Sequence, residues 1–187
     1  MTFIIEKKQM VFTAYYQAVK ALSRDKAEKR IYTKHIMVND HLICGMTNES
    51  LVYFNIPAEI NVPETGLYKP LSVSKSQIIL EKNSEATIKD YPDILDIIHR
   101  TEHKFVCDIY FDNKNLSAHY FISELLYVLG NQYQTRINPE YVYQYLSIYP
   151  SKYIEPFSIY VHKEKSANYP IFISGPDSTF LLMPLTK

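Results

Sequence analysis

The sequence predicts an α+β protein in which two halves each place one helix on an antiparallel sheet. Short apolar segments separated by turn residues recur along the chain, which is typical of antiparallel strands. Two segments, near residues 11–30 and 139–149, instead repeat their apolar residues at helical spacing. Tyr occurs 17 times and Gly only four times, which favours sheets because aromatic side chains fit a pleated, half-buried surface. The 187 residues predict a single domain over 1–187, with halves at about 1–82 and 90–187.

The first half is predicted to run strand, helix and then several strands. Thr2–Glu6 forms the first strand. One apolar face of the following helix is formed by Val11, Tyr15, Ala18, Val19 and Leu22. Further strands are expected at 30–38, 41–46 and 51–56, and turn residues at 39–40 and 48–50 separate them. A loop over 57–69, a strand or strand pair over 71–80 and a polar connection over 81–89 complete this half.

The second half is predicted to contain a hairpin, a helix and closing strands. A short segment over 94–99 precedes strands at 105–111 and 116–121, which face each other across a turn at 112–115. Residues 123–129 suit either helix or strand. Asn138 can cap a helix, Pro139 suits its first position and Glu140 adds negative charge to its first turn. The closing strands are expected at 157–162, 171–173 and 180–183, and Pro184 ends the last of them.

Composition limits the kind of protein this is. Lys plus Arg equals Asp plus Glu, so the formal net charge is zero, which excludes an all-over basic nucleic-acid binder but allows one basic face. Cys44 and Cys107 lie in separate apolar segments without metal-ligand spacing, so we expect two reduced, buried thiols in a cytoplasmic protein. No segment approaches the 18 apolar residues of a membrane helix.

Four segments, in order along the chain, resemble the bacterial sliding DNA clamp family, the β subunit of DNA polymerase III. Thr47–Leu51 stands where that family has an Ala-Thr-Asp-Gly type of turn. Tyr91–Ile94 is similar to its Phe-Pro-Asp-Tyr, Ile137–Val142 to its Phe-Asn-x-x-Tyr-Leu helix start, and Phe180–Leu185 to its terminal Met-Pro-hydrophobic segment. The resemblance implies a clamp-like fold with two helix-on-sheet halves and no enzymatic activity.

This chain also departs from the clamp pattern. Family subunits carry two or three tandem domains and close into rings of six domains, whereas this length suits about one. Asn48 and Glu49 replace the preferred Asp and Gly, and Thr186-Lys187 replaces the usual Arg-Leu. A small clamp of the kind that a phage or mobile element encodes is therefore expected, either a processivity factor in a homo-oligomeric ring or a clamp mimic that binds a host partner.

By the same resemblance, an apolar groove would bind peptide motifs of replication proteins. Its residues would be Leu51, Val52, Pro92, Ile94, Met183, Pro184 and Leu185. Met suits such a groove because its flexible thioether adapts to varied partners. The alternative is that these apolar side chains are core contacts.

A second surface would face DNA. Its basic residues are Lys20, Arg24, Lys26, Lys29, Arg30 and Arg136. In clamps the helices line the DNA hole and contact phosphates without reading sequence. The alternative is a solvated helix end, where cations favour the helix dipole.

No catalytic motif or cofactor site stands out. His99 and His103 flank Glu102, but the Glu that must directly follow the first His of a zinc-protease helix is missing. Asp90, Asp93 and Asp96 lack the Gly and distal Glu of a calcium loop and are interpreted as turn and capping residues. A small α+β enzyme with a site near His99, His103 and Asp93, and an interaction module without DNA contact, remain the competing hypotheses.

Overall fold

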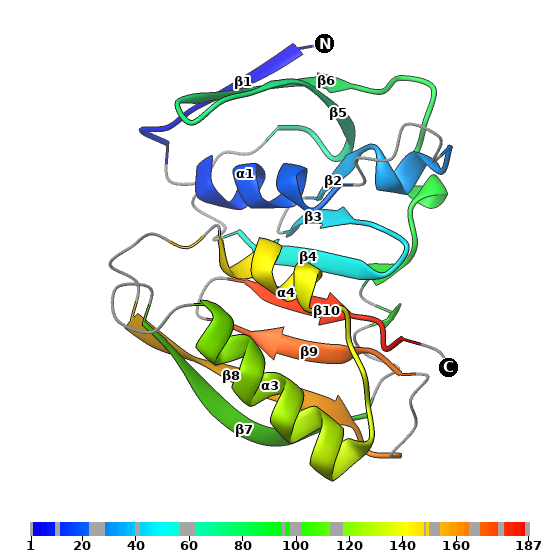
Figure 1. The fold of residues 1–187 in the computed structure, drawn as a ribbon. Coiled ribbons are helices and arrows are strands. Elements are labelled where there is room, and N and C mark those ends of the chain that lie inside the picture. The colour runs from blue at the N-terminus through cyan, green and yellow to red at the C-terminus, as the bar shows by residue number, and fades with distance from the viewer. Residues whose placement is uncertain are drawn as a thin grey trace. The chain divides into compact units, whose positions relative to one another are not determined.

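The computed structural model describes residues 2–9, 12–22, 29–39, 42–56, 63–94, 96–97, 102–112, 118–147, 149, 154–164, 169–175 and 178–185. The chain divides into two compact units, Met1–Ile94 and Leu95–Lys187. Each unit places helix on antiparallel sheet, which confirms the predicted α+β class (Figure 1). The prediction of one domain over 1–187 stays a prediction. Among the described residues, no helix is long and apolar enough to cross a membrane.

In the part of the first unit that the structure describes, six strands pair antiparallel. In chain order they are β1 (Thr2–Glu6), β2 (Ile36–Asn39), β3 (Leu42–Met46), β4 (Ser50–Asn55), β5 (Gly66–Val73) and β6 (Gln77–Lys82). Their order in the sheet is β1-β6-β5-β2-β3-β4. Tight turns explain the β3–β4 and β5–β6 hairpins: Thr47 and Ser74 each accept main-chain hydrogen bonds through their hydroxyl oxygens, so a polar side chain closes each reversal.

Helix α1 (Phe12–Lys20) packs directly on β3. A Cβ atom placed on Gly45 would lie 1.9 Å from the carbonyl oxygen of Ala18, so the helix backbone occupies the space a side chain would need. Tyr15 and Ala18 are fully buried on this face of the helix. Gly45 therefore sets how closely α1 approaches the sheet.

The predicted strand over 30–38 is wrong in its first part. Ile31–Thr33 forms a 3-10 helix, η1, and β2 begins only at Ile36. The hydroxyl of Thr33 donates to the carbonyl of Arg30 at 2.8 Å, and the His35 ring bonds the carbonyl of Ile31 at 2.9 Å. These local bonds hold the backbone in turns that compete with strand pairing.

Two further boundaries in the first unit were predicted wrongly. The expected helix over 11–30 ends at Lys20, because the N–H of Leu22 bonds the carbonyl of Val19 and tightens the last turn, and Lys29 lies outside any helix. Strand β5 begins at Gly66, inside the expected loop, where Tyr68 pairs with both Ile36 and Lys82. A second 3-10 helix, η2 (Ile88–Asp90), interrupts the polar connection.

Within the described residues, the second unit has four antiparallel strands and two longer helices. The strands are β7 (His103–Asp112), β8 (Ile154–His162), β9 (Ile171–Ser174) and β10 (Thr179–Leu182), in the order β10-β9-β8-β7. Helices α3 (Ala118–Tyr133) and α4 (Pro139–Leu146) accompany them (Figure 1). The rings of Phe111, Phe121 and Phe157 meet edge to face with centroids 5.5–6.0 Å apart and form the core.

The predicted hairpin of 105–111 with 116–121 is wrong. Strand β7 pairs with β8, and Phe121 lies in α3. The buried residues Phe121, Leu125 and Leu129 recur every four residues, so the helical period continued through what was interpreted as a returning strand. The predicted start of α4 is confirmed, since the side chain of Asn138 accepts the Glu140 N–H at 3.0 Å.

Candidate functional site

The segment Met183–Leu185 follows directly after β10 in the second unit. The side chains of Met183 and Leu185 are 41% and 47% exposed, while Pro184 between them is buried. The main-chain N–H of Leu185 donates to the carbonyl oxygen of Arg136 at 2.8 Å. The backbone is thus anchored at Pro184 and Leu185, and two apolar side chains are left accessible to a partner.

The start of β10 is held by a buried hydroxyl cluster. The hydroxyls of Tyr145 and Tyr149 lie 2.8 and 2.6 Å from that of Ser178, and 2.9 Å from each other. The ring of Tyr145 also stacks on Phe180, with centroids 4.7 Å apart. The sequence predicts both tyrosines on one apolar face of a helix over 139–149, but α4 ends at Leu146, so Tyr149 lies just after it. The spacing of four residues still brings the two hydroxyls together, and it is the signal from which the cluster could have been predicted.

The carbonyl that binds Leu185 is presented by the end of α3. Gln134 has φ 51°, the left-handed conformation that often ends a helix. The N–H of Thr135 then bonds back to the carbonyl of Leu129 at 3.1 Å, which closes the helix end. Arg136 follows in the connection to α4, where its carbonyl oxygen accepts the Leu185 N–H.

The other residues assigned to the groove lie in the first unit. Leu51 and Val52 on β4 are 4% and 2% exposed, Ile94 is 2% exposed, and Pro92 is half-buried. Leu51, Val52 and Ile94 are therefore buried side chains here, as the alternative interpretation expected. The groove as a whole stays a prediction, and its accessible part in the described residues is Met183 and Leu185.

Cys44 carries a buried thiol in the first unit. The Tyr91 hydroxyl lies 3.5 Å from the carbonyl oxygen of Cys44 and 3.7 Å from its sulfur. Burial raises the pKa of the Cys44 thiol to about 12, and burial likewise raises the pKa of Tyr91. Both cysteines are free, but Cys107 is only half-buried, so the expectation of two buried thiols was wrong for Cys107.

The residues predicted to face DNA do not form one helix face. Lys20 lies in the last turn of α1, whereas Lys29 and Arg30 lie before η1 and Arg136 lies between α3 and α4; all four are exposed. Arg24 and Lys26 fall outside the described residues. Lys20 is the one Lys or Arg within the described helices α1, α3 and α4.

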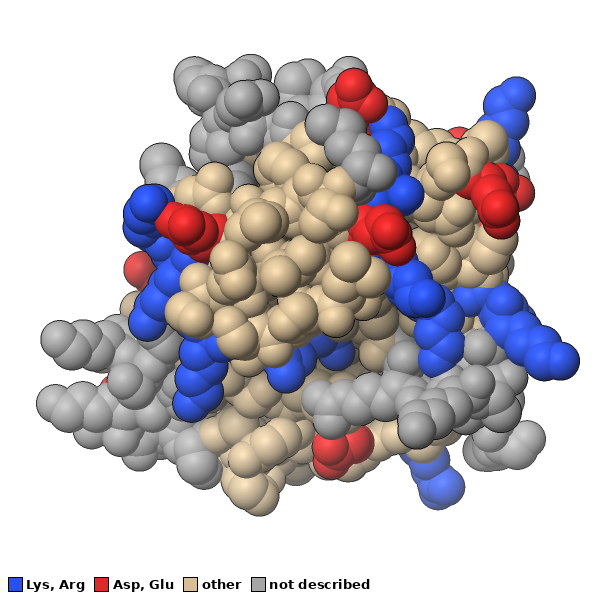
Figure 2. Space-filling model, turned by 90° about the horizontal axis from the view of Figure 1, so that it is seen from above, with Lys and Arg blue, Asp and Glu red and all other residues tan. Residues whose placement is uncertain are grey.

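Interactions and neighbouring charges further weaken the basic surface. The guanidinium of Arg30 donates to the side-chain oxygen of Asn48, and the Lys20 ammonium lies 5.3 Å from the centroid of the Tyr16 ring. On the face that Figure 2 shows, basic side chains are dispersed and several lie beside acidic ones. This arrangement gives loose electrostatic contacts at most.

The residues of the enzyme hypothesis are described by the structure only in part. His99 falls outside the described residues, and the His103 ring packs on Phe172 with centroids 3.7 Å apart. Asp90 accepts the Thr87 N–H at 2.7 Å, which confirms its capping role, and Asp93 is exposed. Within the described ranges no group of three or more His, Cys, Asp or Glu could hold a metal ion.

Comparison with solved structures finds this fold in bacterial replication proteins. The β chain of DNA polymerase III from Streptococcus pneumoniae matches with a TM-score of 0.59 and 12% identity, over 100% of this chain and 65% of that chain. The β subunit from Thermotoga maritima matches with 0.58 and 9%, over 100% and 66%. The Helicobacter pylori β clamp, bound to a DNA ligase peptide, matches with 0.54 and 10%, over 98% and 66%.

These matches identify the fold. This chain spans about 65% of the length of the clamp chains that it matches. No family model and no curated protein matches the sequence. The clamp resemblance predicted from four short segments is confirmed at the level of the fold: the chain has the fold of the bacterial DNA polymerase III β clamps.

Proposed function

We propose that this chain is a non-enzymatic, clamp-like protein that binds a peptide segment of a replication protein through Met183–Leu185. The observation that carries the proposal is the pair of exposed apolar side chains, Met183 and Leu185, on a backbone anchored between them by buried Pro184 and the bond to Arg136. An anchored backbone loses little freedom on binding, so the apolar contacts contribute more of their free energy to affinity.

The chemistry of the two side chains fits a peptide partner. Met fills irregular apolar gaps without strain, and Leu offers a branched surface that packs against apolar anchors of the peptide. A β clamp of the same fold has been solved with a DNA ligase peptide. The assembly of this chain distinguishes two roles. A processivity factor would form a homo-oligomeric ring, whereas a clamp mimic would need no ring.

Peptide binding is tested by fluorescence anisotropy with the labelled DNA ligase peptide. The double variant Met183→Ala/Leu185→Ala should weaken binding at least about tenfold, since each truncation removes roughly 1 kcal/mol or more of apolar contact. Leu126→Ala is a matched control, because Leu126 on α3 is 38% exposed and lies outside the proposed contact. Equal affinity of the wild type and the double variant would contradict the proposal, as would equal weakening by the control.

A second candidate function, contact with duplex DNA, is favoured by the exposed cations Lys29, Arg30 and Arg136. It predicts weak, sequence-independent binding that falls steeply with salt. Binding of a labelled duplex should decrease for Lys29→Gln/Arg136→Gln and stay unchanged for Lys75→Gln, an exposed lysine in the β5–β6 turn.

The solution mass distinguishes a homo-oligomeric ring from a monomer. Light scattering across a concentration range should give a closed multiple of the chain mass for a ring that encircles DNA. A monomer at every concentration would exclude the ring while leaving the peptide proposal intact. The cytoplasmic location and the origin in a phage or mobile element stay predictions.

A further inference from the structure

One side of helix α3 presents two exposed tyrosines with a carboxylate between them. Tyr120, Glu124 and Tyr127 stand at positions i, i+4 and i+7, so they share one side of the helix and form what we call the tyrosine ridge. Tyr120 and Tyr127 are 49% and 67% exposed, and Glu124 is half-buried. In the part of the chain that the structure describes, none of these three side chains makes a hydrogen bond, an ion pair or a ring contact. The ridge is therefore available to a partner.

The packing of α3 does not require the tyrosine ridge. The buried side chains of this helix, which include Phe121, Leu125 and Leu129, lie on another side and complete its contact with the core. Tyr120 and Tyr127 thus hold large aromatic rings in water. Exposed tyrosines of this kind are typical of protein interfaces, because each ring offers a broad contact area and has little conformational freedom to lose on binding.

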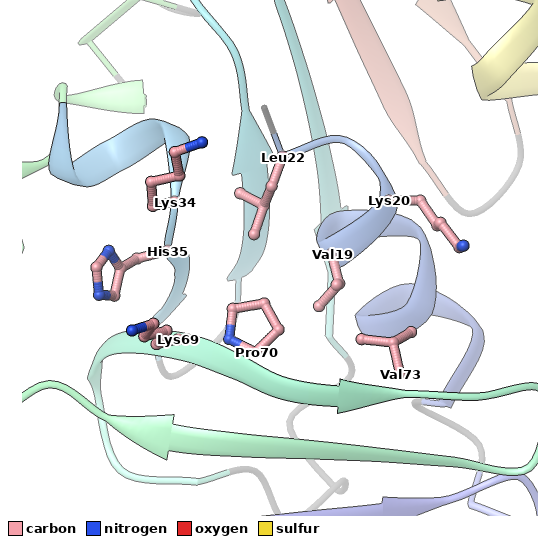
Figure 3. A pocket seen from close by; sticks show the side chains of 8 residues that line it. All are labelled: Val19, Lys20, Leu22, Lys34, His35, Lys69, Pro70 and Val73. Atoms are coloured by element: carbon pink, nitrogen blue, oxygen red, sulfur yellow. The ribbon is translucent and has the colours of Figure 1, made fainter. Parts of the chain in front are cut away.

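The charges around the ridge favour a cationic partner. Helices α3 and α4 contain no Lys or Arg. Burial and then the negative charges of Asp108 and Glu124 raise the pKa of the Cys107 thiol, so both carboxylates act on the same part of the second unit. The lysines that Figure 3 shows line a hollow beside the end of α1, in the first unit. The ridge therefore attracts cations and repels phosphates.

We propose that the tyrosine ridge docks an arginine-containing segment of a partner protein, with a guanidinium paired to Glu124 and stacked on the ring of Tyr120 or Tyr127. Along the helix axis Glu124 stands about 6 Å from Tyr120 and about 4.5 Å from Tyr127, so a cation on the carboxylate lies within reach of either ring. Arginine fits better than lysine, because its planar group can bond a carboxylate through two N–H groups and also stack on a ring.

The occupant is a protein segment because a convex helix face cannot enclose a free small molecule. A peptide can place its guanidinium on Glu124 and cover the neighbouring rings with adjacent residues. This partner is basic, whereas the segment proposed to bind at Met183–Leu185 is held by apolar contacts. The two surfaces are therefore independent, and one can fail without the other.

An NMR titration of the full chain with a peptide of alternating Arg and Gly tests the proposal. Saturable shifts should appear at the amides of α3 around the ridge, and added salt should weaken the binding. The same peptide with Lys in place of Arg should bind more weakly, and the peptide with Glu should not bind. Glu124→Gln should weaken the Arg peptide about two- to fivefold, and Tyr120→Ala/Tyr127→Ala about five- to twentyfold.

The matched controls are Glu85→Gln, an exposed glutamate of the first unit, and Tyr143→Ala, a tyrosine on α4 that is 43% exposed. Both should bind the Arg peptide like the wild type. The variant Met183→Ala/Leu185→Ala should also bind it normally, which separates this proposal from the proposed function.

Three results would overturn the proposal. The first is the absence of saturable shifts in α3 at millimolar Arg peptide, and the second is equal affinity of the wild type and the ridge variants. The third is a different occupant of the ridge: tighter binding of a DNA duplex there, or shifts of the same amides with protein concentration alone, which would indicate a second copy of this chain.

Discussion

The main-chain N–H of Leu185 and the carbonyl oxygen of Arg136 form a hydrogen bond 2.8 Å long. The sequence assigned these residues to two different sites, a peptide groove and a DNA-facing surface. In the structure, the connection between α3 and α4 instead supports the segment after β10. Arg136 contributes its main-chain carbonyl oxygen, which any residue at this position has. The side chain of Arg136 is exposed to solvent.

Gln134→Gly should stabilise the protein by about 1 kcal/mol. Gln134 has φ 51°, and the left-handed region costs a residue with a side chain roughly that amount relative to Gly. Urea unfolding of the two proteins measures the difference. Gln132→Gly, an exposed change inside the same helix, is the control and should instead cost about 1 kcal/mol. Destabilisation by both changes would show that the side chain of Gln134 supports the helix end.

Truncating the proposed peptide contacts should cost little stability. Met183→Ala and Leu185→Ala remove exposed side chains, so each should change the free energy of unfolding by less than about 1 kcal/mol. Leu182→Ala, one residue earlier and fully buried, should cost about 2–5 kcal/mol. Thermal and urea unfolding provide the comparison. A large loss at Met183 or Leu185 would indicate core residues, and the peptide proposal would then lose its main support.

Local signals made part of this fold predictable. The cap at Asn138 and the strand predicted at 180–183 depend on adjacent residues, and both lie close to where they were expected. The four family segments also led to the correct fold, although the chain is only about 9–12% identical to the clamps with that fold.

The wrong predictions concern elements whose pairing depends on residues that are distant in sequence. Phe105–Phe111 pairs with β8, some 50 residues away, and nothing near residue 112 encodes that choice. The same holds for the candidate sites. The Leu185–Arg136 bond and the hydroxyl cluster at Ser178 each join segments that are far apart in sequence. Side-chain type therefore suggested candidate residues, but only tertiary structure could group them.

Alkaline pH should destabilise the first unit through Cys44. Its thiol has a pKa of about 12 in the folded protein, against an ordinary value of 9.0 when unfolded. Between these values the unfolded chain releases a proton that the folded protein keeps, so stability falls as pH rises from about 9 to 12, by up to about 1.4 kcal/mol per pH unit. The raised pKa of Tyr91 adds a loss of the same sign at the upper end of this range.

Urea unfolding at about pH 8 and about pH 10.5 tests this linkage. Cys44→Ala should show a smaller loss of stability between the two pH values than the wild type. Cys107→Ala is the comparison: burial also raises the pKa of this thiol, but it is only half-buried, so the change should reduce the pH dependence less than Cys44→Ala does. An identical pH dependence of the wild type and Cys44→Ala would mean that the thiol ionises equally in both states.

Two glycine-to-alanine changes should have opposite effects. At Gly45 a Cβ would lie 1.9 Å from the Ala18 carbonyl oxygen and 2.7 Å from its carbon, and both atoms belong to the backbone of α1. The helix would have to move off β3, and we expect a loss of at least about 3 kcal/mol, or failure to fold. At Gly130, inside α3, a Cβ would meet nothing within 4 Å, so alanine should stabilise the helix by about 0.5–1 kcal/mol. Urea unfolding measures both changes, and hydrogen exchange of the α1 amides reports whether Gly45→Ala loosens that helix. Near-wild-type stability of Gly45→Ala would mean that α1 can shift on its sheet without loss, and the close helix–sheet contact would then not determine the fold of the first unit.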